Sequence, residues 1–266
     1  MVTFPNAKIN LGLYILSERP DGYHNIHSCF YPVPFADVLE IVTSEQFEFK
    51  SSGLSIPGSG NLCIQAFEML KTNHGIGNVK IHLHKVIPIG AGLGGGSANA
   101  TFTLNMLNEI FNLNLQTEAL ETYAARLGSD CPFFVRNIPV IASDTGTTLK
   151  PLDISLKGMY LALISPGIHV STAQAYSGVS PTSADNNLQN LLKQPIMKWR
   201  NELINDFEKS VFPQHPKIKH IKTQLYGLGA LYSSMTGSGS AVYALFENEV
   251  DLSSLKGQLS WSGFLD

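Results

Sequence analysis

The stretch PIGAGLGGGSANA, residues 88 to 100, places five glycines within the seven positions from Gly90 to Gly96. Glycine loses more backbone freedom on folding than any other residue, so a cluster of this density needs a local reason. An alternating apolar pattern, typical of a strand, precedes the cluster, and a helical pattern from about Ser97 to Phe111 follows it. When a strand, a glycine loop and a helix follow in this order, unpaired N–H groups at the helix start face outward and attract anions. The sequence therefore predicts that this loop binds a phosphate group.

Four alternative interpretations of the same loop fit the residues less well. A tight strand-to-helix turn needs one or two glycines, which is fewer than the loop contains. Residues 90–95 match G-x-G-x-x-G, so a nicotinamide-dependent oxidoreductase is an alternative, although FNLNLQTEALE does not supply the acidic residue expected about 20 positions later. No lysine precedes Ser97, as a Walker A loop requires, and the H-R-D and D-F-G segments of protein kinases are absent.

The composition favours a soluble cytoplasmic protein. The chain has 266 residues, is 44% hydrophobic and carries a net charge of −3, which argues against a dedicated nucleic-acid or membrane binder. Cys29, Cys63 and Cys131 are far apart and fit a reducing compartment better than a disulfide framework or a zinc site. The start has no basic signal region, no apolar run reaches transmembrane length, and no segment indicates an obligate protein partner.

The order of elements predicts an α+β fold. Strand and helix patterns alternate without regular βαβ repeats, and the character of the chain changes near residue 150, where we expect a boundary between domains 1–150 and 151–266. Residues 4–16 alternate as a strand with one buried apolar face, which leaves Lys8 and Asn10 on the opposite face. The segment 201–209 is expected to be helical, and the last residues, LSSLKGQLSWSGFLD, carry no recognisable motif.

Three segments together resemble one family. PNAKINLGL near the start, PIGAGLGGGSANA in the middle and MTGSGSAVYALF near the end are similar, in this order, to the motifs of the GHMP small-molecule kinases. The resemblance implies ATP as phosphoryl donor and Mg²⁺ as cofactor. It also implies an N-terminal domain with a left-handed βαβ unit and a C-terminal ferredoxin-like domain.

Further segments resemble one branch of that family. These segments are AKINLGLYILSERPDGYHNIHS, RLGSDCPFF, SPGIHVSTAQAY and NDFE. The likeness implies phosphorylation of the 2-hydroxyl of a cytidylyl methylerythritol in the non-mevalonate isoprenoid pathway. Another GHMP small-alcohol kinase, similar to mevalonate or homoserine kinase, is the alternative. A second alternative is a non-catalytic nucleotide-binding protein, but the presence of both Lys8 and Asp130 argues against it.

The resemblance implies a role for each matching residue. Lys8 and Asp130 are expected to be catalytic, although a solvated lysine and a loop-capping aspartate are the ordinary fates of such residues. Ser97 is a candidate Mg²⁺ ligand. Substrate binding is expected at Asn10, Tyr23, His24, Thr172 and Tyr176. ATP binding is expected at Asn61, Leu62, Pro88, Gly90, Ala91, Gly92, Leu93, Gly94, Gly95, Gly96, Ser97, Gly237, Ser238 and Gly239.

Two expectations concern geometry. A side chain at Gly94 or Gly95 should block the approach of a phosphate while leaving the fold largely intact. Tyr23 and Tyr176 should flank the cytosine ring, with His24 hydrogen-bonding the edge of that ring.

Overall fold

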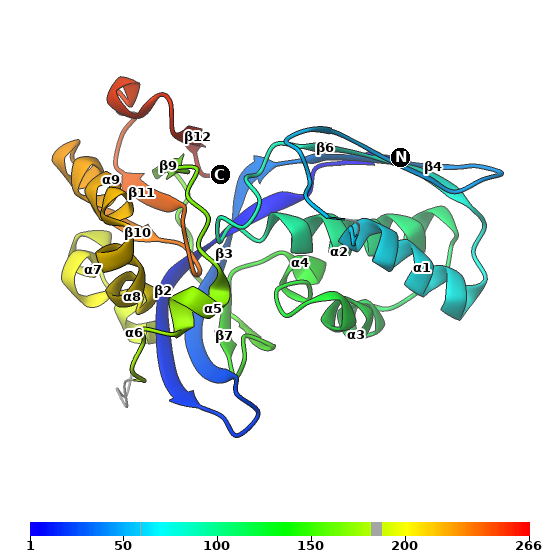
Figure 1. Ribbon diagram of the computed structural model, residues 1–266, viewed down its shortest axis with the longest axis horizontal. Coiled ribbons are helices and arrows are strands. Elements are labelled where there is room, and N and C mark those ends of the chain that lie inside the picture. The colour runs from blue at the N-terminus through cyan, green and yellow to red at the C-terminus, as the bar shows by residue number, and fades with distance from the viewer. Residues whose placement is uncertain (59, 182–187) are drawn as a thin grey trace. The chain divides into compact units, whose positions relative to one another are not determined.

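A computed structural model describes residues 1–58, 60–181 and 188–266 (Figure 1). The chain divides into two compact units, each assembled from separate segments. Unit 1 consists of Met1–Ala7, Pro34–Ile89 and Gly94–Ile138. Unit 2 consists of Lys8–Val33, Gly90–Leu93 and Pro139–Asp266. The boundaries of these units differ from the single division expected near residue 150, because each unit combines several separate segments. The division into domains 1–150 and 151–266 stays a prediction.

Unit 1 is built on a four-stranded sheet with the order β1-β4-β6-β5. The strands are β1 (Val2–Thr3), β4 (Val38–Thr43), β5 (Glu48–Gly53) and β6 (Val79–Lys85). Strand β6 alternates strictly between buried and exposed residues, as its sequence predicts, but the last buried position holds Lys85 in place of an apolar residue. Strand β5 runs parallel to β6 and the two are joined through helix α1, so the expected βαβ unit is present.

Helices cover one side of this sheet, as Figure 1 shows. They are α1 (Leu62–His74), α2 (Gly95–Ile110), α3 (Thr117–Leu127) and α4 (Phe133–Arg136). Their apolar faces join Leu39, Ile41, Ile81 and Leu83 of the sheet in a continuous core. Helix α2 begins directly at the glycine loop, so the predicted order of strand, glycine loop and helix is confirmed.

Unit 2 contains a first sheet with the order β2-β3-β7-β8. Its strands are β2 (Asn6–Glu18), β3 (His24–Ala36), β7 (Val140–Ser143) and β8 (Thr148–Pro151). The predicted turn in SERPDGYHN joins β2 to β3. Strand β2 is buried on both faces over most of its length, so the expectation of a single buried face was wrong.

The second sheet of unit 2 has the order β10-β11-β9-β12, and every neighbouring pair is antiparallel. Its strands are β9 (Tyr160–Ile164), β10 (Tyr232–Met235), β11 (Val242–Phe246) and β12 (Leu259–Phe264). In chain order this is the 2-3-1-4 arrangement of a ferredoxin-like sheet. The segment without a motif supplies the fourth strand, and a short 3₁₀ turn, η1 (Ser253–Leu255), stands where such folds place their second crossover helix.

The helices of unit 2 are α5 (Thr172–Tyr176), α6 (Leu188–Leu192), α7 (Ile196–Glu202), α8 (Phe207–Gln214) and α9 (Pro216–Gly227). The prediction of a continuous helix over 201–209 was wrong, because α7 ends at Glu202 and α8 begins at Phe207. The connection between them pairs with β2, where Leu13 donates its N–H to the Ile204 carbonyl at 2.8 Å. Backbone pairing with a distant strand therefore overrides the local helical pattern.

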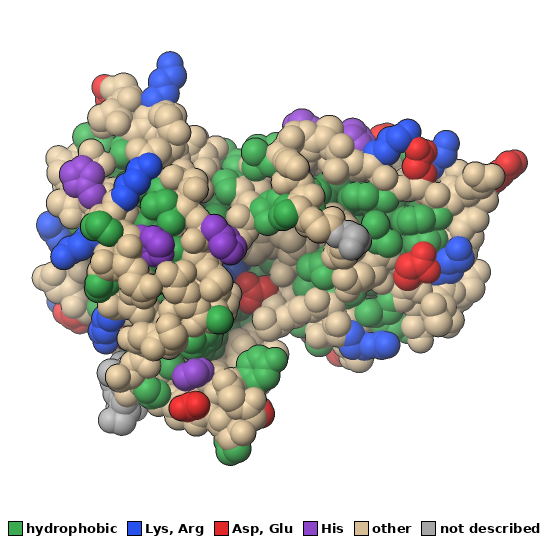
Figure 2. Space-filling view, in the orientation of Figure 1, with side chains coloured by type: hydrophobic (Ala, Val, Ile, Leu, Met, Phe, Trp, Pro, Cys, Tyr) green, Lys and Arg blue, Asp and Glu red, His purple; other side chains and the backbone are tan. Residues whose placement is uncertain are grey.

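The surface of unit 1 carries mixed charges. Figure 2 shows positive and negative side chains intermingled over the end that carries β4 and β6. Paired residues contribute to this pattern, since Lys50 and Glu48 approach to 2.6 Å. Among the described residues, no helix has both the length and the apolar character needed to cross a membrane.

Candidate functional site

A deeply buried polar network of unit 2 surrounds Lys8 on strand β2. The exposed fraction of Lys8 is only 3%, and that of Asn10 is 2%, so Lys8 is not a solvated surface lysine. The ammonium nitrogen of Lys8 donates to Oδ1 of Asn10 at 2.8 Å and lies 4.6 Å from the centroid of the Phe30 ring. Nδ2 of Asn10 donates to the Ser28 hydroxyl at 2.9 Å. The ammonium group of Lys8 therefore lies between an amide oxygen and an aromatic face, both of which attract a cation.

Thr236 connects this network to the glycine loop. Its hydroxyl accepts the backbone N–H of Asn10 at 3.1 Å and lies 3.1 Å from the carbonyl oxygen of Gly92. The backbone N–H of Lys8 donates to the Leu93 carbonyl at 2.9 Å. The strand that bears Lys8 therefore runs directly beside the first part of the glycine loop.

The two glycine segments of unit 2 also contact each other. Gly92 has a φ of +79°, and a Cβ at that position would overlap the carbonyl oxygen of Thr236. A Cβ on Gly237 would meet Gly92 at 3.1 Å, and Ala241 donates its N–H to the Ala91 carbonyl at 3.1 Å. Glycine is required at these positions because the two backbones touch. Ser238 and Gly239 complete the turn beside this contact, at the tip between β10 and β11.

The second part of the loop forms the start of helix α2 in unit 1. Gly94 is the N-cap residue, with a φ of +69°, and no side chain of the described residues caps the helix there. Gly95 packs tightly, since its Cβ would stand 2.8 Å from Ile87 and 2.9 Å from Nζ of Lys85. Around Gly96, no other atom of the described residues lies within 4 Å of an added Cβ.

These environments correct one expectation. A side chain at Gly95 would collide with Ile87 and Lys85. At Gly94 the backbone is left-handed, a conformation that costs an L-residue about 1–2 kcal/mol. We therefore expect both substitutions to destabilise unit 1, whereas Gly96 is the open position. The uncapped helix start, with space in front of it, has the form of an anion cradle.

Ser97 and Asp130 lie in the same part of unit 1. The side chains of Ser97 and Thr101 both lie near the Cys131 thiol, and Cys131 follows Asp130 directly in the chain. Burial raises the pKa of Cys131 to about 11, so the thiol stays neutral beside these groups. Thr101 fixes the segment, because its hydroxyl donates to the carbonyl of Cys131 at 2.8 Å. Asp130, half-buried, is thus tethered to the first turns of α2.

Asn61 and Leu62 stand at the start of helix α1. Oδ1 of Asn61 accepts the backbone N–H of Cys63 at 2.8 Å and caps the helix, while Leu62 packs against the core of unit 1. Pro88 is half-buried in the turn that follows β6. The structure gives the first two residues local structural roles, and their expected contact with adenine stays a prediction.

The expected substrate residues of unit 2 include one aromatic stack. The ring of His24 lies on the ring of Tyr176, with centroids 4.6 Å apart and planes inclined by 27°, and Phe207 meets Tyr176 edge-on. Tyr23 is 67% exposed, and Thr172 is exposed on the first turn of α5. His24 therefore covers one face of Tyr176. The flanking of a cytosine by Tyr23 and Tyr176 stays a prediction.

Sequence reasoning missed a buried ion pair beneath the glycine loop. Lys85 forms a salt bridge with Asp37, and both side chains are at most 3% exposed. Asp37 also accepts the backbone N–H groups of Val86 and Ile87, at 2.7 and 2.8 Å, and Nδ2 of Asn99 on α2 at 2.8 Å. Burial lowers the pKa of Lys85, and Asp37 opposes that shift. The one available signal was a lysine at an inward position of the alternating strand β6.

Comparison with known proteins agrees with this arrangement. Residues 61–137 match the family model of the GHMP kinases N terminal domain, and residues 188–260 match that of the GHMP kinases C terminal domain. The chain is 50% identical over 249 residues to the 4-diphosphocytidyl-2-C-methyl-D-erythritol kinase of Parabacteroides distasonis. That alignment covers 93% of this chain and 92% of that protein. It is 49% identical over 252 residues to the protein of the same name from Cytophaga hutchinsonii, covering 94% and 93%.

A solved structure matches over nearly the whole chain. The crystal structure of a 4-(cytidine 5'-diphospho)-2C-methyl-D-erythritol kinase superposes with a TM-score of 0.87 at 30% identity, covering 99% of this chain and 98% of that one. The nicotinamide oxidoreductase is excluded by these matches. By its sequence, its fold and the order of its motifs, the chain belongs to the GHMP kinase family.

Proposed function

We propose that this enzyme transfers the γ-phosphoryl group of ATP to the 2-hydroxyl of 4-diphosphocytidyl-2-C-methyl-D-erythritol. Relatives that carry this activity in their names share half of the residues over more than nine-tenths of the chain. The observation that carries the proposal is the position of Lys8, a buried cation whose own backbone is hydrogen-bonded to the glycine loop at Leu93. A small-molecule kinase needs a fixed positive charge next to its phosphate-binding backbone.

The chemistry assigns different tasks to Lys8 and Asp130. The acceptor hydroxyl loses its proton as the new P–O bond forms, and the carboxylate of Asp130 takes that proton. The ammonium of Lys8 stabilises the charge that develops on the phosphoryl oxygens. Phosphoryl transfer passes through a loose transition state, so positioning of the hydroxyl matters more than the basicity of the carboxylate. Asn10 orients Lys8 and, in this proposal, the substrate.

ATP phosphates are assigned to the glycine loop. Open space at Gly96 and the uncapped start of α2 fit a phosphate group, because backbone N–H groups there have room for an anion. The Ser97 hydroxyl is the residue that would hold Mg²⁺, an oxygen ligand of the kind this ion prefers. The ion, when bound, neutralises charge on the phosphates. Gly237, Ser238 and Gly239 support the loop through the contact at Gly92.

The cytidylyl part is assigned to unit 2. Tyr176 and Tyr23 supply aromatic surface for the base, His24 supplies a ring nitrogen, and Thr172 lies one turn from Tyr176 on α5. Aromatic stacking on a base is worth about 1–3 kcal/mol. The enzyme is further proposed to act in the cytoplasm on two small molecules, without nucleic acid, membrane or an obligate protein partner. Its three cysteines are buried free thiols, in keeping with a reducing compartment.

A phosphoryl-transfer assay tests the proposal. The purified chain is incubated with ATP, Mg²⁺ and one alcohol at a time: the cytidylyl methylerythritol, mevalonate, phosphomevalonate or homoserine. We expect ADP release with the cytidylyl substrate far above that with the others, and a product phosphorylated at the 2-hydroxyl. Faster turnover of mevalonate or homoserine would favour the other small-alcohol kinases, and ATP binding without turnover of any alcohol would favour a non-catalytic protein.

A further inference from the structure

The motif NDFE, residues 205–208, has no part in the chemistry proposed above, although Asn205 and Asp206 are among the most buried polar residues of unit 2. Asn205 is 2% exposed and Asp206 is fully buried. The motif spans the break in the expected helix, after α7, and the start of α8. Two polar side chains buried at a break between helices need a reason, because burial of unpaired polar groups destabilises a fold.

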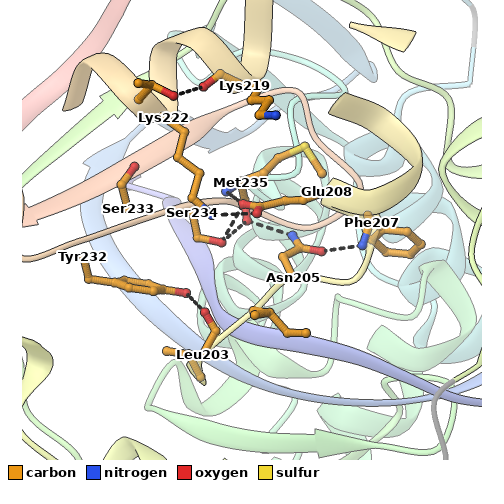
Figure 3. Close-up of polar contacts among 12 residues, drawn as sticks. Leu203, Asn205, Phe207, Glu208, Lys219, Lys222, Tyr232, Ser233, Ser234 and Met235 are labelled. Atoms are coloured by element: carbon orange, nitrogen blue, oxygen red, sulfur yellow. Dashed lines mark hydrogen bonds and ion pairs between the residues drawn. The ribbon is translucent and has the colours of Figure 1, made fainter. Parts of the chain in front are cut away.

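The amide of Asn205 holds the end of strand β10. Its Nδ2 donates to the Met235 carbonyl at 2.8 Å and to the Gly237 carbonyl at 2.9 Å, and its Oδ1 accepts the backbone N–H of Phe207 at 3.0 Å. Figure 3 shows Asn205 between Phe207 and Met235 in this arrangement. Both hydrogens of the amide nitrogen are used. Asn205 therefore fixes the two carbonyl groups on either side of a single residue, Thr236.

Thr236 is the residue that joins the glycine loop to Lys8. Its hydroxyl meets Asn10 and Gly92, and Asn10 in turn accepts the Lys8 ammonium group. Gly237, the second residue held by Asn205, is the one whose backbone touches Gly92. A rotation of the peptide groups at 235–237 would move both contacts together.

The rest of the motif anchors Asn205 itself. Oδ2 of Asp206 accepts the backbone N–H of Ile15 on β2 at 2.9 Å, and the Asp206 N–H donates to the Leu13 carbonyl at 2.8 Å. Oε1 of Glu208 accepts the Met235 N–H at 2.9 Å, while its Oε2 pairs with Lys222 at 2.6 Å (Figure 3). The segment is thus tied at one side to the strand that bears Lys8 and at the other to the strand that leads into Thr236.

We propose that Asn205 is a positioning residue of the kinase reaction, which acts through Thr236 to hold the 236–239 turn against the glycine loop and Asn10. This inference rests on the proposed function, because it assigns the turn a task in phosphoryl transfer. An amide is required at position 205. A carboxylate of the same shape keeps the contact with the Phe207 N–H but presents oxygen atoms to two carbonyl oxygens.

The test compares Asn205→Asp with a matched control, Tyr226→Phe. The Tyr226 hydroxyl also bonds two backbone groups of β10, both at Ser233 and both at 3.1 Å, but it lies at the other end of the strand, away from the turn. We expect Asn205→Asp to lower kcat/KM for ATP by about 10²-fold, the loss typical of a reacting group displaced by about 1 Å. Tyr226→Phe should leave both kcat and KM close to the wild-type values, whatever it costs in thermal stability.

A double-mutant cycle with Thr236→Val separates positioning from stability. If Asn205 acts through Thr236, the combined variant loses much less activity than the product of the two single losses. Should Asn205→Asp fail to fold, as judged by circular dichroism, Asn205→Ser takes its place in the same cycle. Losses that multiply, or an Asn205 variant with lower stability and unchanged kcat/KM, would overturn the inference.

The same experiment distinguishes an error in the proposed function from an error in the role of Asn205. Wild-type enzyme that phosphorylates another alcohol instead of the cytidylyl substrate contradicts that function, and the cycle is then measured with the accepted alcohol. Failure of the cycle with an active wild-type enzyme contradicts only the role of Asn205.

Discussion

The ammonium nitrogen of Lys8 lies 2.8 Å from Oδ1 of Asn10, inside a strand where both side chains are almost fully buried. Burial of a lysine is costly unless the charge is used or well paired. We predict that Lys8→Met lowers kcat by about 10²–10³-fold, the typical effect of removing one group that stabilises transition-state charge. The Kd for ATP, measured by calorimetry, should change little, because the proposed site binds the phosphates mainly through the glycine backbone. A Lys8→Met enzyme with near-normal kcat would contradict the assignment.

Asp130 gives the matching prediction in unit 1. Asp130→Asn keeps the shape of the side chain but accepts no proton, so kcat should fall by at least about 10²-fold, the lower range for general acid–base catalysis. When combined with Lys8→Met, the loss should be much smaller than the product of the two, because residues that act as a unit are not additive. Single-turnover kinetics of both single variants and the double variant provide the measurement. Multiplying losses would show that the two residues work independently.

How much of this site the sequence predicts depends on where the partners come from. The alternation over residues 4–16 correctly places Ile9, Leu11 and Ile15 inward. It does not predict that Lys8 and Asn10 are buried as well, because Asn10, which accepts the Lys8 ammonium group, is itself held by Ser28 and Thr236 from other segments of the chain. Periodicity reports which face of a strand is apolar, and it carries no information about polar partners supplied by other segments of the chain.

The largest errors in the fold have the same origin. The local pattern predicts a helix over 201–209, yet backbone pairing with Leu13 interrupts that helix at residues 203–206. Strand β12 begins with the short alternation Leu-Ser-Trp-Ser, but its first five residues are all half-buried, and its pairing with the distant strand β9 is not a local property of the sequence. In contrast, the order of strand, glycine loop and helix was predicted correctly, because a helix start after a glycine loop is a local feature of the sequence.

Gly96 provides the cleanest test of the phosphate site. The backbone there is helical and an added Cβ meets no described atom, so Gly96→Val should leave the fold intact and only fill the space in front of the helix start. We expect a large rise in the Kd for ATP, because a phosphate needs close approach to the backbone N–H groups. Gly227→Ala, at the end of α9, is the control, since a Cβ there also meets no described atom. Unchanged ATP affinity in Gly96→Val would remove the loop from the site.

Specificity for the cytidylyl group is tested at Tyr176. Tyr176→Ala removes the surface on which His24 stacks, and we expect binding of the cytidylyl substrate to weaken by about 1–3 kcal/mol, the value of one base stack. ATP affinity should hardly change. Tyr123→Ala is the matched control, because Tyr123 also pairs with a histidine ring, His74, but in unit 1. Equal weakening of both ligands by Tyr176→Ala, or of neither, would contradict the pocket assignment.

The buried salt bridge between Lys85 and Asp37 leads to a prediction about the free energy of unfolding and its dependence on pH. Asp37→Asn leaves the buried Lys85 charge without its partner, which typically costs about 3–5 kcal/mol of unfolding free energy. Lys85→Met should cost less, because Asp37 keeps the N–H groups of Val86 and Ile87 and the amide of Asn99.

The pH dependence of the Asp37→Asn variant follows from the same geometry. Burial already lowers the pKa of Lys85, and loss of the opposing carboxylate lowers it further. The unfolded chain keeps its lysine proton up to an ordinary pKa of about 10.4, so above the folded pKa the unfolded state binds more protons and stability rises with pH. The deficit of Asp37→Asn relative to wild type should therefore shrink as the pH is raised from neutral toward that value. Asp21→Asn, which breaks the exposed pair with Arg19, should leave the urea midpoint nearly unchanged at every pH. A deficit that grows with pH, or a larger loss in Lys85→Met than in Asp37→Asn, would show that the lysine charge is not what destabilises the variant.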